Sequence, residues 1–281
     1  MRLDPRDHDR SNAGLTYVYP VISRRAGGVS IGINLNVNRA CNWRCVYCQV
    51  PGLIFGNPPD CDLELLEREL DGMLEEVVRG DFLERRVPAG ARRLNDVAFS
   101  GDGESTSSPQ FAEAVGLATA ALERFGVADD VRCVLITNGS LIHRPTVQQG
   151  LRRMASVRGE VWYKLDSATA AGQQRMNTNR AGVERARANL VRAAELCPTW
   201  IQTMALDWNG STLAGAELEA YLELVGGLVR EGVPLRGVLL YGLARPSHQP
   251  EATELSALPL AELERIGRAI EALGLPVKIT P

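Results

Sequence analysis

The sequence predicts an α/β fold, a partial (β/α)6 TIM-like barrel with an N-terminal hairpin extension. Short apolar runs alternate with longer segments whose apolar residues recur at helical spacing, which is typical of a parallel sheet flanked by helices. The length of 281 residues suits one such barrel, and no linker rich in Pro, Gly or Ser interrupts it. We therefore expect a single domain over 1–281, with an arm and hairpin in 1–30 and the barrel in 31–281.

The first predicted element is a hairpin between residues 16 and 37, in which Ala-Gly-Gly at 26–28 supplies the positive-φ turn. Six strands, each followed by an amphipathic segment, are expected from the periodicity, and a short last strand is expected in 276–280. The six strands cover residues 31–37, 96–100, 131–137, 160–166, 200–206 and 237–241.

The helices between the strands are predicted by spacing and by end signals. Pro145 fits the first turn of one helix, and Gly126 follows the end of the helix before it. The clearest apolar stripe at helical spacing consists of Leu66, Leu70, Met73 and Val77.

Two predicted strands have a polar face. Alternation along 31–37 places Asn34, Asn36 and then Asn38 on one side, and alternation along 160–166 does the same for Lys164 and Asp166. Parallel strands are usually apolar on both faces. We interpret the polar faces as lining a lumen that holds a polar ligand. The alternative is that these residues lie at strand ends, where polarity costs little.

Three cysteines, Cys41, Cys45 and Cys48, lie within eight residues directly after the first predicted strand. The N-terminal residues MRLDPRDHDR contain no apolar stretch, and no apolar run reaches about 18 residues, so we expect a cytoplasmic protein that does not enter a membrane. In a reducing compartment such a cysteine cluster indicates metal binding or redox chemistry rather than disulfides. The net charge of −3 gives no argument for a nucleic-acid or membrane partner.

Three thiolates are one fewer than a closed tetrahedral metal site needs. They can hold three irons of a [4Fe-4S] cube and leave the fourth iron open to a substrate or cofactor. The alternative is a zinc site that a distant residue completes.

The spacing C-x-x-x-C-x-x-C, with Tyr47 before the last cysteine, resembles the signature of the radical S-adenosylmethionine (SAM) enzymes. FSGDGEST, LITNGS, WYKLDS and LLYGLARPS are most similar to the iron-sulfur oxidoreductase branch of that superfamily, which is related to wyosine-forming tRNA enzymes. The resemblance implies reductive cleavage of S-adenosyl-L-methionine at a [4Fe-4S] cluster to a 5'-deoxyadenosyl radical, which abstracts a hydrogen atom from an unidentified substrate. It also implies an electron donor such as flavodoxin or ferredoxin.

The resemblance assigns Cys41, Cys45 and Cys48 as the cluster ligands and places Tyr47 near the adenine of SAM. The cysteines Cys61, Cys133 and Cys197 are far apart in the sequence, and we expect them to be buried or incidental thiols.

The segment Gly101, Asp102, Gly103 and Glu104 resembles the glycine-rich SAM motif of the family. Both glycines permit close backbone approach, and Glu104 can pair with the methionyl ammonium group. The next residue, Ser105, stands where many relatives have proline. The alternative is an ordinary turn.

Thr137 and Asn138 end the third predicted strand, where their short side chains can reach the ribose or adenine of SAM; the alternative is a capped turn in TNGS.

Four further candidates lie near predicted strand ends. Lys164 and Asp166 are candidate catalytic residues, and Lys164 is also a candidate SAM-binding, carboxylate-binding or Schiff-base residue. For this pair the alternative is an ion pair without chemistry. Gln202 and Arg245 are candidate cofactor-binding residues, and Arg245 offers a planar fork for a carboxylate or phosphate.

Several substrate classes remain open within this interpretation. They are a small molecule, tRNA modified as in the wyosine-type enzymes, and a protein partner activated through a glycyl radical. A noncatalytic iron-sulfur protein or a zinc-stabilised binding module lies outside the class. No basic stripe with interleaved aromatic residues supports tRNA, although SRRAGG and RRLNDV contain local basic pairs.

Overall fold

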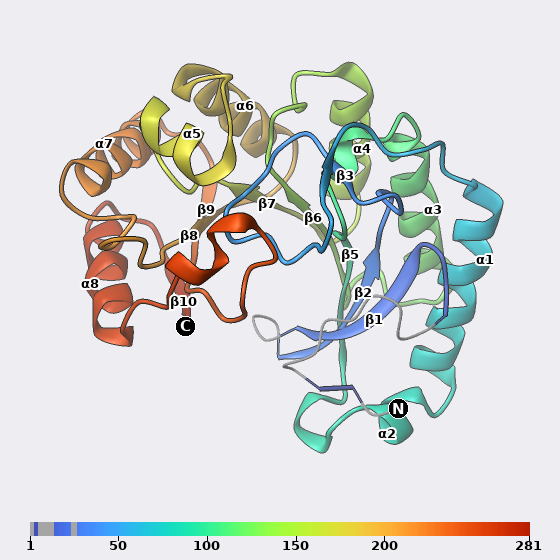
Figure 1. Cartoon of the computed structure of the whole chain (residues 1–281). Coiled ribbons are helices and arrows are strands. Elements are labelled where there is room, and N and C mark those ends of the chain that lie inside the picture. Colours follow the sequence, from blue (N-terminus) through green and yellow to red (C-terminus); the bar gives the residue numbers. More distant parts are fainter. Residues whose placement is uncertain (1–2, 5–13, 24–26) are drawn as a thin grey trace. The chain divides into compact units, whose positions relative to one another are not determined.

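The computed structural model describes residues 3–4, 14–23 and 27–281 (Figure 1). The chain divides into two compact units. The first comprises Met1–Cys41, Gly56–Ile136 and Arg144–Glu160, and the second comprises Asn42–Phe55, Thr137–His143 and Val161–Pro281. The boundary separates Cys41 from Cys45 and Cys48, so we describe each unit by itself.

The first unit contains four hydrogen-bonded strands in the order β1, β2, β5 and β6. β1 is antiparallel to β2, and the other neighbours are parallel. The strands are β1 (Val18–Ser23), β2 (Gly28–Ile33), β5 (Leu94–Phe99) and β6 (Arg132–Thr137), the last of which ends in the second unit.

The predicted hairpin is formed by β1 and β2, which pair from Val18 opposite Ile33 to Ser23 opposite Gly28. In the predicted turn, Gly27 has a φ of 69°, whereas Ala26 lies outside the described residues. The predicted strand over 31–37 is wrong in its second half, because β2 ends at Ile33. There the side chain of Asn34 accepts a hydrogen bond from the backbone N–H of Asn36 at 3.0 Å, which turns the chain out of the sheet.

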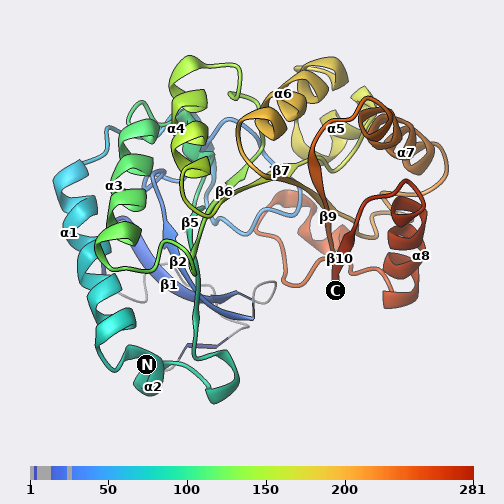
Figure 2. The ribbon, with the colours of Figure 1, turned by 180° about the vertical axis from the view of Figure 1, so that it is seen from behind.

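Helices cover the strands of the first unit (Figures 1 and 2). Asp62 caps the first helix, and the predicted apolar stripe of Leu66, Leu70 and Met73 is buried. The helical elements are α1 (Leu63–Leu74), the π turn η1 (Glu75–Arg79), α2 (Phe82–Arg86), the 3₁₀ turns η2 (Ala89–Ala91) and η3 (Ser105–Ser107), α3 (Phe111–Arg124) and α4 (Pro145–Ala155).

The second unit contains parallel strands in the order β7, β8, β9 and β10, alternating with helices. The strands are β7 (Gly159–Lys164), β8 (Thr199–Met204), β9 (Leu235–Tyr241) and β10 (Val277–Thr280), and β7 begins in the first unit. The helices are α5 (Ala170–Asn177), α6 (Val183–Leu196), α7 (Gly215–Arg230), the 3₁₀ turn η4 (Pro250–Glu254) and α8 (Leu260–Glu271). The short strands β3 (Ala40–Cys41) and β4 (Ile54–Phe55) flank the cysteine loop.

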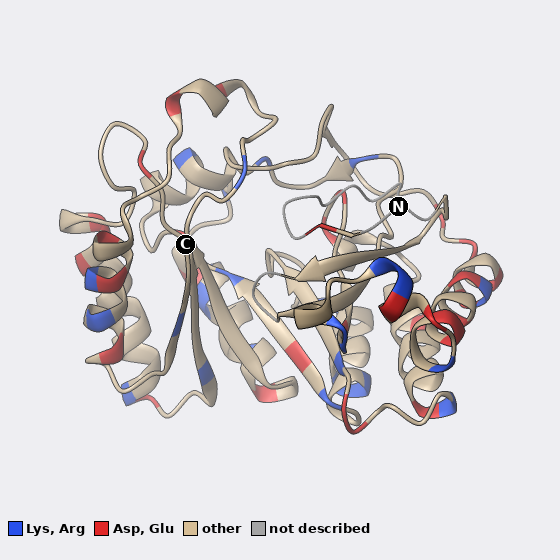
Figure 3. Ribbon diagram, turned by 90° about the horizontal axis from the view of Figure 1, so that it is seen from below, with Lys and Arg blue, Asp and Glu red and all other residues tan. Residues whose placement is uncertain are grey.

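The predicted α/β alternation is confirmed, and the observed strands begin or end within a few residues of the predicted ones. The single-domain assignment stays a prediction. No helix in the described part of the chain is long and apolar enough to cross a membrane. Basic and acidic residues are interspersed along the helices (Figure 3).

Glu69 of α1 holds the start of β1. It is 8% exposed, and its carboxylate accepts backbone N–H donors from Thr16, Tyr17 and Val18 at 2.7, 2.7 and 3.2 Å. We expect Glu69→Ala to lower the free energy of unfolding by about 3 kcal/mol, because three donors lose a charged acceptor. The exposed Glu64 of the same helix provides the control. Glu64→Ala should change the free energy of unfolding by less than about 0.5 kcal/mol. Urea unfolding of both variants measures this, and equal effects would contradict the role of Glu69.

Candidate functional site

In the first unit, Cys41 follows a turn that packs directly against the GDGE segment. Asn36 donates a hydrogen bond to the carbonyl of Ala40 at 2.8 Å. A Cβ atom on Gly103 would lie 2.1 Å from the same carbonyl, and one on Gly101 would lie 2.4 Å from the Asn34 side chain. Only glycine fits at these two positions. The predicted close approach to the glycine backbone is therefore present, but the groups that approach it belong to Ala40 and Asn34 of this chain.

The predicted polar face of asparagines has a different role from the one expected. Asn34 donates to Asp102 at 2.8 Å and accepts from the Asp102 backbone at 3.1 Å, and Asn38 bonds the loop carbonyl of Asn57 at 3.0 Å. These residues follow β2 and do not share a strand face. Their short amides fix the GDGE segment and the approach to Cys41.

Glu104 is 3% exposed and precedes the 3₁₀ turn Ser105–Ser107. Its Oε1 atom accepts hydrogen bonds from the Thr106 hydroxyl at 2.6 Å and from the Thr106 backbone at 3.2 Å. The carboxylate therefore caps this turn. Its assignment to the SAM ammonium stays a prediction.

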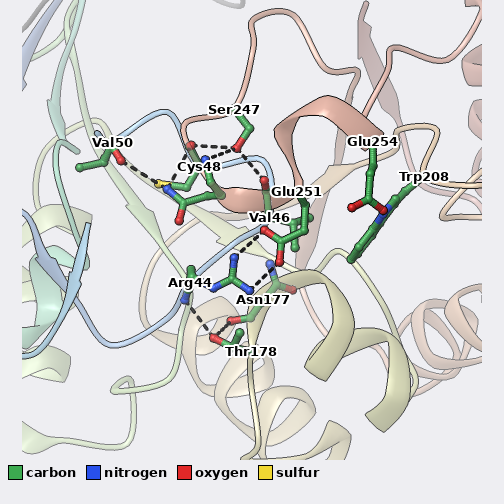
Figure 4. A network of polar contacts seen from close by, with 11 residues as sticks. Arg44, Val46, Cys48, Val50, Asn177, Thr178, Trp208, Ser247, Glu251 and Glu254 are labelled. Carbon is green, nitrogen blue, oxygen red and sulfur yellow. Dashed lines mark hydrogen bonds and ion pairs between the residues drawn. The ribbon is translucent and has the colours of Figure 1, made fainter. Parts of the chain in front are cut away.

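In the second unit, the cysteine loop is held by a strap that we define as residues 245–254 (Figure 4). Ser247 donates to the carbonyl of Val46 at 2.6 Å and to that of Cys48 at 3.1 Å, while the His248 backbone donates to Cys48 at 2.9 Å. Gln249 donates to the carbonyl of Val50 at 3.3 Å. The strap thus satisfies carbonyls along the loop, whose irregular backbone offers few internal partners.

An ion pair between Arg44 and Glu251 joins the cysteine loop to the strap. The two terminal nitrogens of Arg44 donate to the two carboxylate oxygens of Glu251 at 2.6 and 2.7 Å, as Figure 4 shows. The side chains are 27% and 18% exposed. The hydrogen bond from Arg44 lowers the pKa of Glu251 below 4.5, with burial opposing it, and the same bond raises the pKa of Arg44.

Asp166 connects the cysteine loop to the sheet. One carboxylate oxygen accepts hydrogen bonds from the Tyr47 hydroxyl and from Asn177, the latter at 2.8 Å, and the other accepts from the Met204 backbone at 2.9 Å. Asn177 also donates to the sulfur of Cys45 at 3.2 Å. The Asp166 carboxylate is thus engaged by groups that position Tyr47 and Cys45, and its catalytic assignment stays a prediction.

Lys164 lies next to two tyrosines. Its Nζ atom donates to the Tyr241 hydroxyl at 2.8 Å and lies 4.8 Å from the ring centroid of Tyr47. Burial would lower the pKa of Lys164, but the charges of Tyr241, Asp166 and Cys45 raise it above its ordinary value. Among the described residues, no salt bridge joins Lys164 to Asp166. The ion pair that we considered as the alternative role is therefore not formed.

Burial also raises the pKa of two residues in the cysteine loop, Cys45 and Tyr47. It raises the pKa of the Cys45 thiol to about 11, although the Lys164 charge opposes the rise. Burial raises the pKa of Tyr47 as well, and the neighbouring Asp166 charge adds to this. Tyr47 therefore remains a neutral hydrogen-bond donor at neutral pH.

Thr137 and Asn138 form the turn that was the alternative to a SAM contact. The Thr137 hydroxyl accepts from the Gly139 backbone at 2.9 Å, and Asn138 accepts from the Ser140 backbone at 3.0 Å. Asn138 also donates to Asn42, beside the cysteines, at 2.8 Å. Their contact with a cofactor stays a prediction.

The remaining predicted residues differ in their surroundings. Arg245 is half-buried at the start of the strap, and Gln202 on β8 is 1% exposed. The three clustered cysteines are half-buried, whereas Cys61, Cys133 and Cys197 are buried as expected. Within the described residues, no group of three or more His, Cys, Asp or Glu side chains is assembled as a metal site. The cluster-ligand assignment therefore stays a prediction.

Sequence reasoning missed several residues that position the loop. Arg44 lies inside the cysteine motif and Ser247 is the last residue of LLYGLARPS, so position within a motif was an available signal for both. Asn177 and Glu251 lie outside the motifs, ten residues after WYKLDS and four residues after LLYGLARPS. Their roles depend on long-range contacts that a single sequence does not reveal.

No protein-family model matches the chain. Two curated proteins of Helicobacter pylori, both called UPF0026 protein, are each 25% identical over 163 residues, which is 56% of this chain. The aligned part spans only 44% of the length of those relatives.

Solved structures share the fold. The structure of TYW1 with a lysine–pyruvate adduct bound is 15% identical and has a TM-score of 0.57 over 86% of this chain and 73% of that chain. A radical SAM methyltransferase from Sphaerobacter thermophilus is 13% identical, with a TM-score of 0.58 over 90% of this chain and 66% of that chain. Archaeal TYW1 is 14% identical, with a TM-score of 0.51 over 86% of this chain and 71% of that chain. The chain therefore has the α/β partial-barrel fold of these radical SAM structures, and the predicted fold class and resemblance are confirmed at that level.

The ion pair between Arg44 and Glu251 should stabilise the protein in a pH-dependent way. A double-mutant cycle with Arg44→Met and Glu251→Gln should give a coupling of about 1–2 kcal/mol at pH 7. The pKa of Glu251 is lower in the folded state than in the unfolded state. The stabilisation by the ion pair is therefore complete at a pH above the unfolded-state pKa, and it is lost as the pH falls through the folded-state pKa. Denaturant unfolding between pH 7 and about pH 2 measures the coupling, which should stay nearly constant down to the unfolded-state pKa and fall below it. A coupling that persists unchanged to the lowest pH, or grows as the pH falls, would contradict the assignment.

Proposed function

We propose that this chain is a radical SAM enzyme in which Cys41, Cys45 and Cys48 ligate a [4Fe-4S] cluster and the GDGE segment contributes to binding of S-adenosyl-L-methionine. The observation that carries the proposal is the place of the C-x-x-x-C-x-x-C loop. It follows the first parallel strand of a fold that matches radical SAM structures over most of the chain.

The residues present suit these two cofactors. Three thiols are half-buried and lie close in sequence, and thiolates are the ordinary ligands of iron-sulfur clusters. The Nε2 atom of buried Gln202 has no hydrogen-bond partner among the described residues, so the unit retains a polar group for a ligand. When bound, the cluster supplies the electron that cleaves SAM to methionine and the 5'-deoxyadenosyl radical.

The chain's own residues have positioning roles in this proposal. Asn177 donates to the Cys45 sulfur, and a hydrogen bond to a cluster ligand influences the reduction potential. Tyr47 is fixed by Asp166, and the strap holds the backbone on both sides of Cys48. A rigid loop keeps the ligands from rearranging as the charge of the site changes.

The substrate is unidentified, and a small flavoprotein or ferredoxin in the cytoplasm is the expected electron donor. The interspersed charges in Figure 3 give no support to tRNA as a substrate. Arg92 of the second basic pair donates to backbone carbonyls of Val87 and Glu84, and Arg24 and Arg25 lie outside the described residues. A glycyl-radical protein partner remains the other alternative.

The cysteine assignment is tested by anaerobic reconstitution. The chain should bind one oxygen-labile cluster of about four irons and release 5'-deoxyadenosine from SAM under reduction. Cys41→Ala, Cys45→Ala and Cys48→Ala should each lose the cluster spectrum and the product, whereas Cys197→Ala, a buried thiol outside the motif, should keep both. A full cluster in a variant that lacks all three motif cysteines would refute the proposal.

Glu104 is tested by a substitution that separates its charge from its capping bond. Glu104→Gln keeps an Oε1 acceptor for Thr106, so the melting temperature and the cluster spectrum should be unchanged. If the carboxylate pairs with the SAM ammonium group, loss of its charge should weaken SAM binding about 10-fold or more. Equilibrium binding to the reconstituted enzyme measures this. Unchanged SAM affinity would leave Glu104 with a capping role only.

A further inference from the structure

Three consecutive residues at the C-terminal end of α5 are bonded to three consecutive residues of the cysteine loop. The hydrogen bonds run from the Val46 N–H to the carbonyl of Met176 at 2.9 Å, from the Asn177 amide to the Cys45 sulfur at 3.2 Å, and from the Arg44 N–H to the Thr178 hydroxyl at 3.0 Å. The last carbonyls of a helix have no partner within the helix, so this end is free to hold another segment. We refer to residues 176–178 as the α5 clamp.

Thr178 has a strained backbone within the α5 clamp. Its φ of 54° lies in the left-handed region, where glycine or asparagine is usual after a helix and a β-branched residue is unfavourable. Its hydroxyl accepts from the Arg44 backbone, as Figure 4 shows, and donates to the carbonyl of Asn177 at 2.6 Å. Such strain persists only where the surrounding contacts impose it. The bond to the cysteine loop therefore favours threonine at a position whose backbone suits glycine.

The side chain of Asn177 has a fixed orientation. It is 2% exposed, and its Nδ2 atom donates to the Asp166 carboxylate at 2.8 Å as well as to the Cys45 sulfur. A flipped amide would direct its oxygen at a carboxylate and a sulfur, neither of which donates to it. The scaffold thus holds one N–H group of Asn177 against the Cys45 sulfur.

Two charged side chains at the end of β7 act on Cys45 in opposite directions. Burial raises the pKa of the Cys45 thiol to about 11, the Lys164 charge opposes this rise, and the Asp166 charge adds to it. The N–H group of Asn177 differs from both, because it contacts the sulfur directly. A donor to a ligand sulfur stabilises the reduced, more negative cluster more than the oxidised one.

We propose that the α5 clamp positions Cys45 and that the Asn177 N–H group raises the reduction potential of the cluster. The cluster then accepts one electron from its external donor more readily, and no proton moves in this step. Asn177 is a positioning residue, because it contacts a cluster ligand and not the reacting atoms. This inference rests on the proposed function and deepens it, since it concerns how the redox state of the same site is controlled.

The effect of Asn177 is measured as a midpoint potential. The anaerobically reconstituted full chain is titrated spectroelectrochemically without SAM. Asn177→Leu should shift the equilibrium constant of one-electron reduction about threefold or more toward the oxidised cluster, which is about 28 mV. Asn177→Ala gives the same test with less bulk if leucine prevents cluster assembly. An unchanged or higher potential in a variant that retains the cluster would overturn the proposal.

Asn179 provides a matched control two residues away. It is 5% exposed, and its side chain donates to Gln173 at 3.0 Å and accepts from the Ala181 backbone at 2.9 Å. Neither contact involves the cysteine loop. Asn179→Leu should lower the melting temperature and leave the midpoint potential unchanged. If it shifts the potential as much as Asn177→Leu does, loosening of the α5 end explains both results, and the role of the Asn177 N–H group is wrong.

The α5 clamp is tested separately on the full chain without a cluster. Thr178→Gly removes the hydroxyl acceptor but relieves the left-handed strain, so the melting temperature should change little. Hydrogen exchange in the peptide over residues 43–46, measured by mass spectrometry, should become about fivefold faster or more, because the Arg44 N–H loses its partner. Unchanged exchange would contradict the clamp.

The two readouts separate this inference from the proposed function. A wild-type chain that binds no cluster would refute the proposed function, and hydrogen exchange would still test the clamp. A chain that binds a cluster and cleaves SAM, but whose midpoint potential is the same with and without the Asn177 amide, would refute this inference alone.

Discussion

The organisation of the second unit depends on the hydrogen bonds of one carboxylate. Asp166 fixes Tyr47 in the cysteine loop, Asn177 at the end of α5 and the backbone of Met204 at the end of β8. A buried carboxylate requires such donors, because burial without them is strongly unfavourable. Its hydrogen bonds therefore hold three separate chain segments together at one point. The apolar cluster of Val46, Tyr47, Met176, Met204 and Leu206 then packs around that point.

The alternation of strands and helices could be predicted because it depends on periodicity, which is local in the sequence. The contacts that position the cysteine loop could not, since they join residues far apart. Tyr47 and Asp166 are 119 residues apart, and Arg44 and Glu251 are 207 apart. The error after β2 has a different cause. Asparagine alternating with apolar residues looks like a strand with a polar face, but Asn34 bonds its own backbone and ends the strand.

Candidate residues chosen by motif can have structural roles in the same place. Glu104 caps a turn, and Thr137 and Asn138 form another turn. Position 103 must be glycine because the carbonyl of Ala40 leaves no room for a side chain there. A group whose geometry is already fixed by the fold binds a ligand with less loss of conformational entropy.

Lys164 and Asp166 are two residues apart, yet the fold treats them differently. The Asp166 oxygens accept hydrogen bonds from a phenol, an amide and a backbone N–H, which stabilise the buried carboxylate. Lys164 donates a hydrogen bond to the Tyr241 hydroxyl, lies near the Tyr47 ring and has Gln202 as its register partner on β8. Asp166 therefore acts in two ways in the second unit. Its oxygens hold the cysteine loop, α5 and β8 by hydrogen bonds, and its charge, together with those of Tyr241 and Cys45, raises the pKa of Lys164 against the effect of burial.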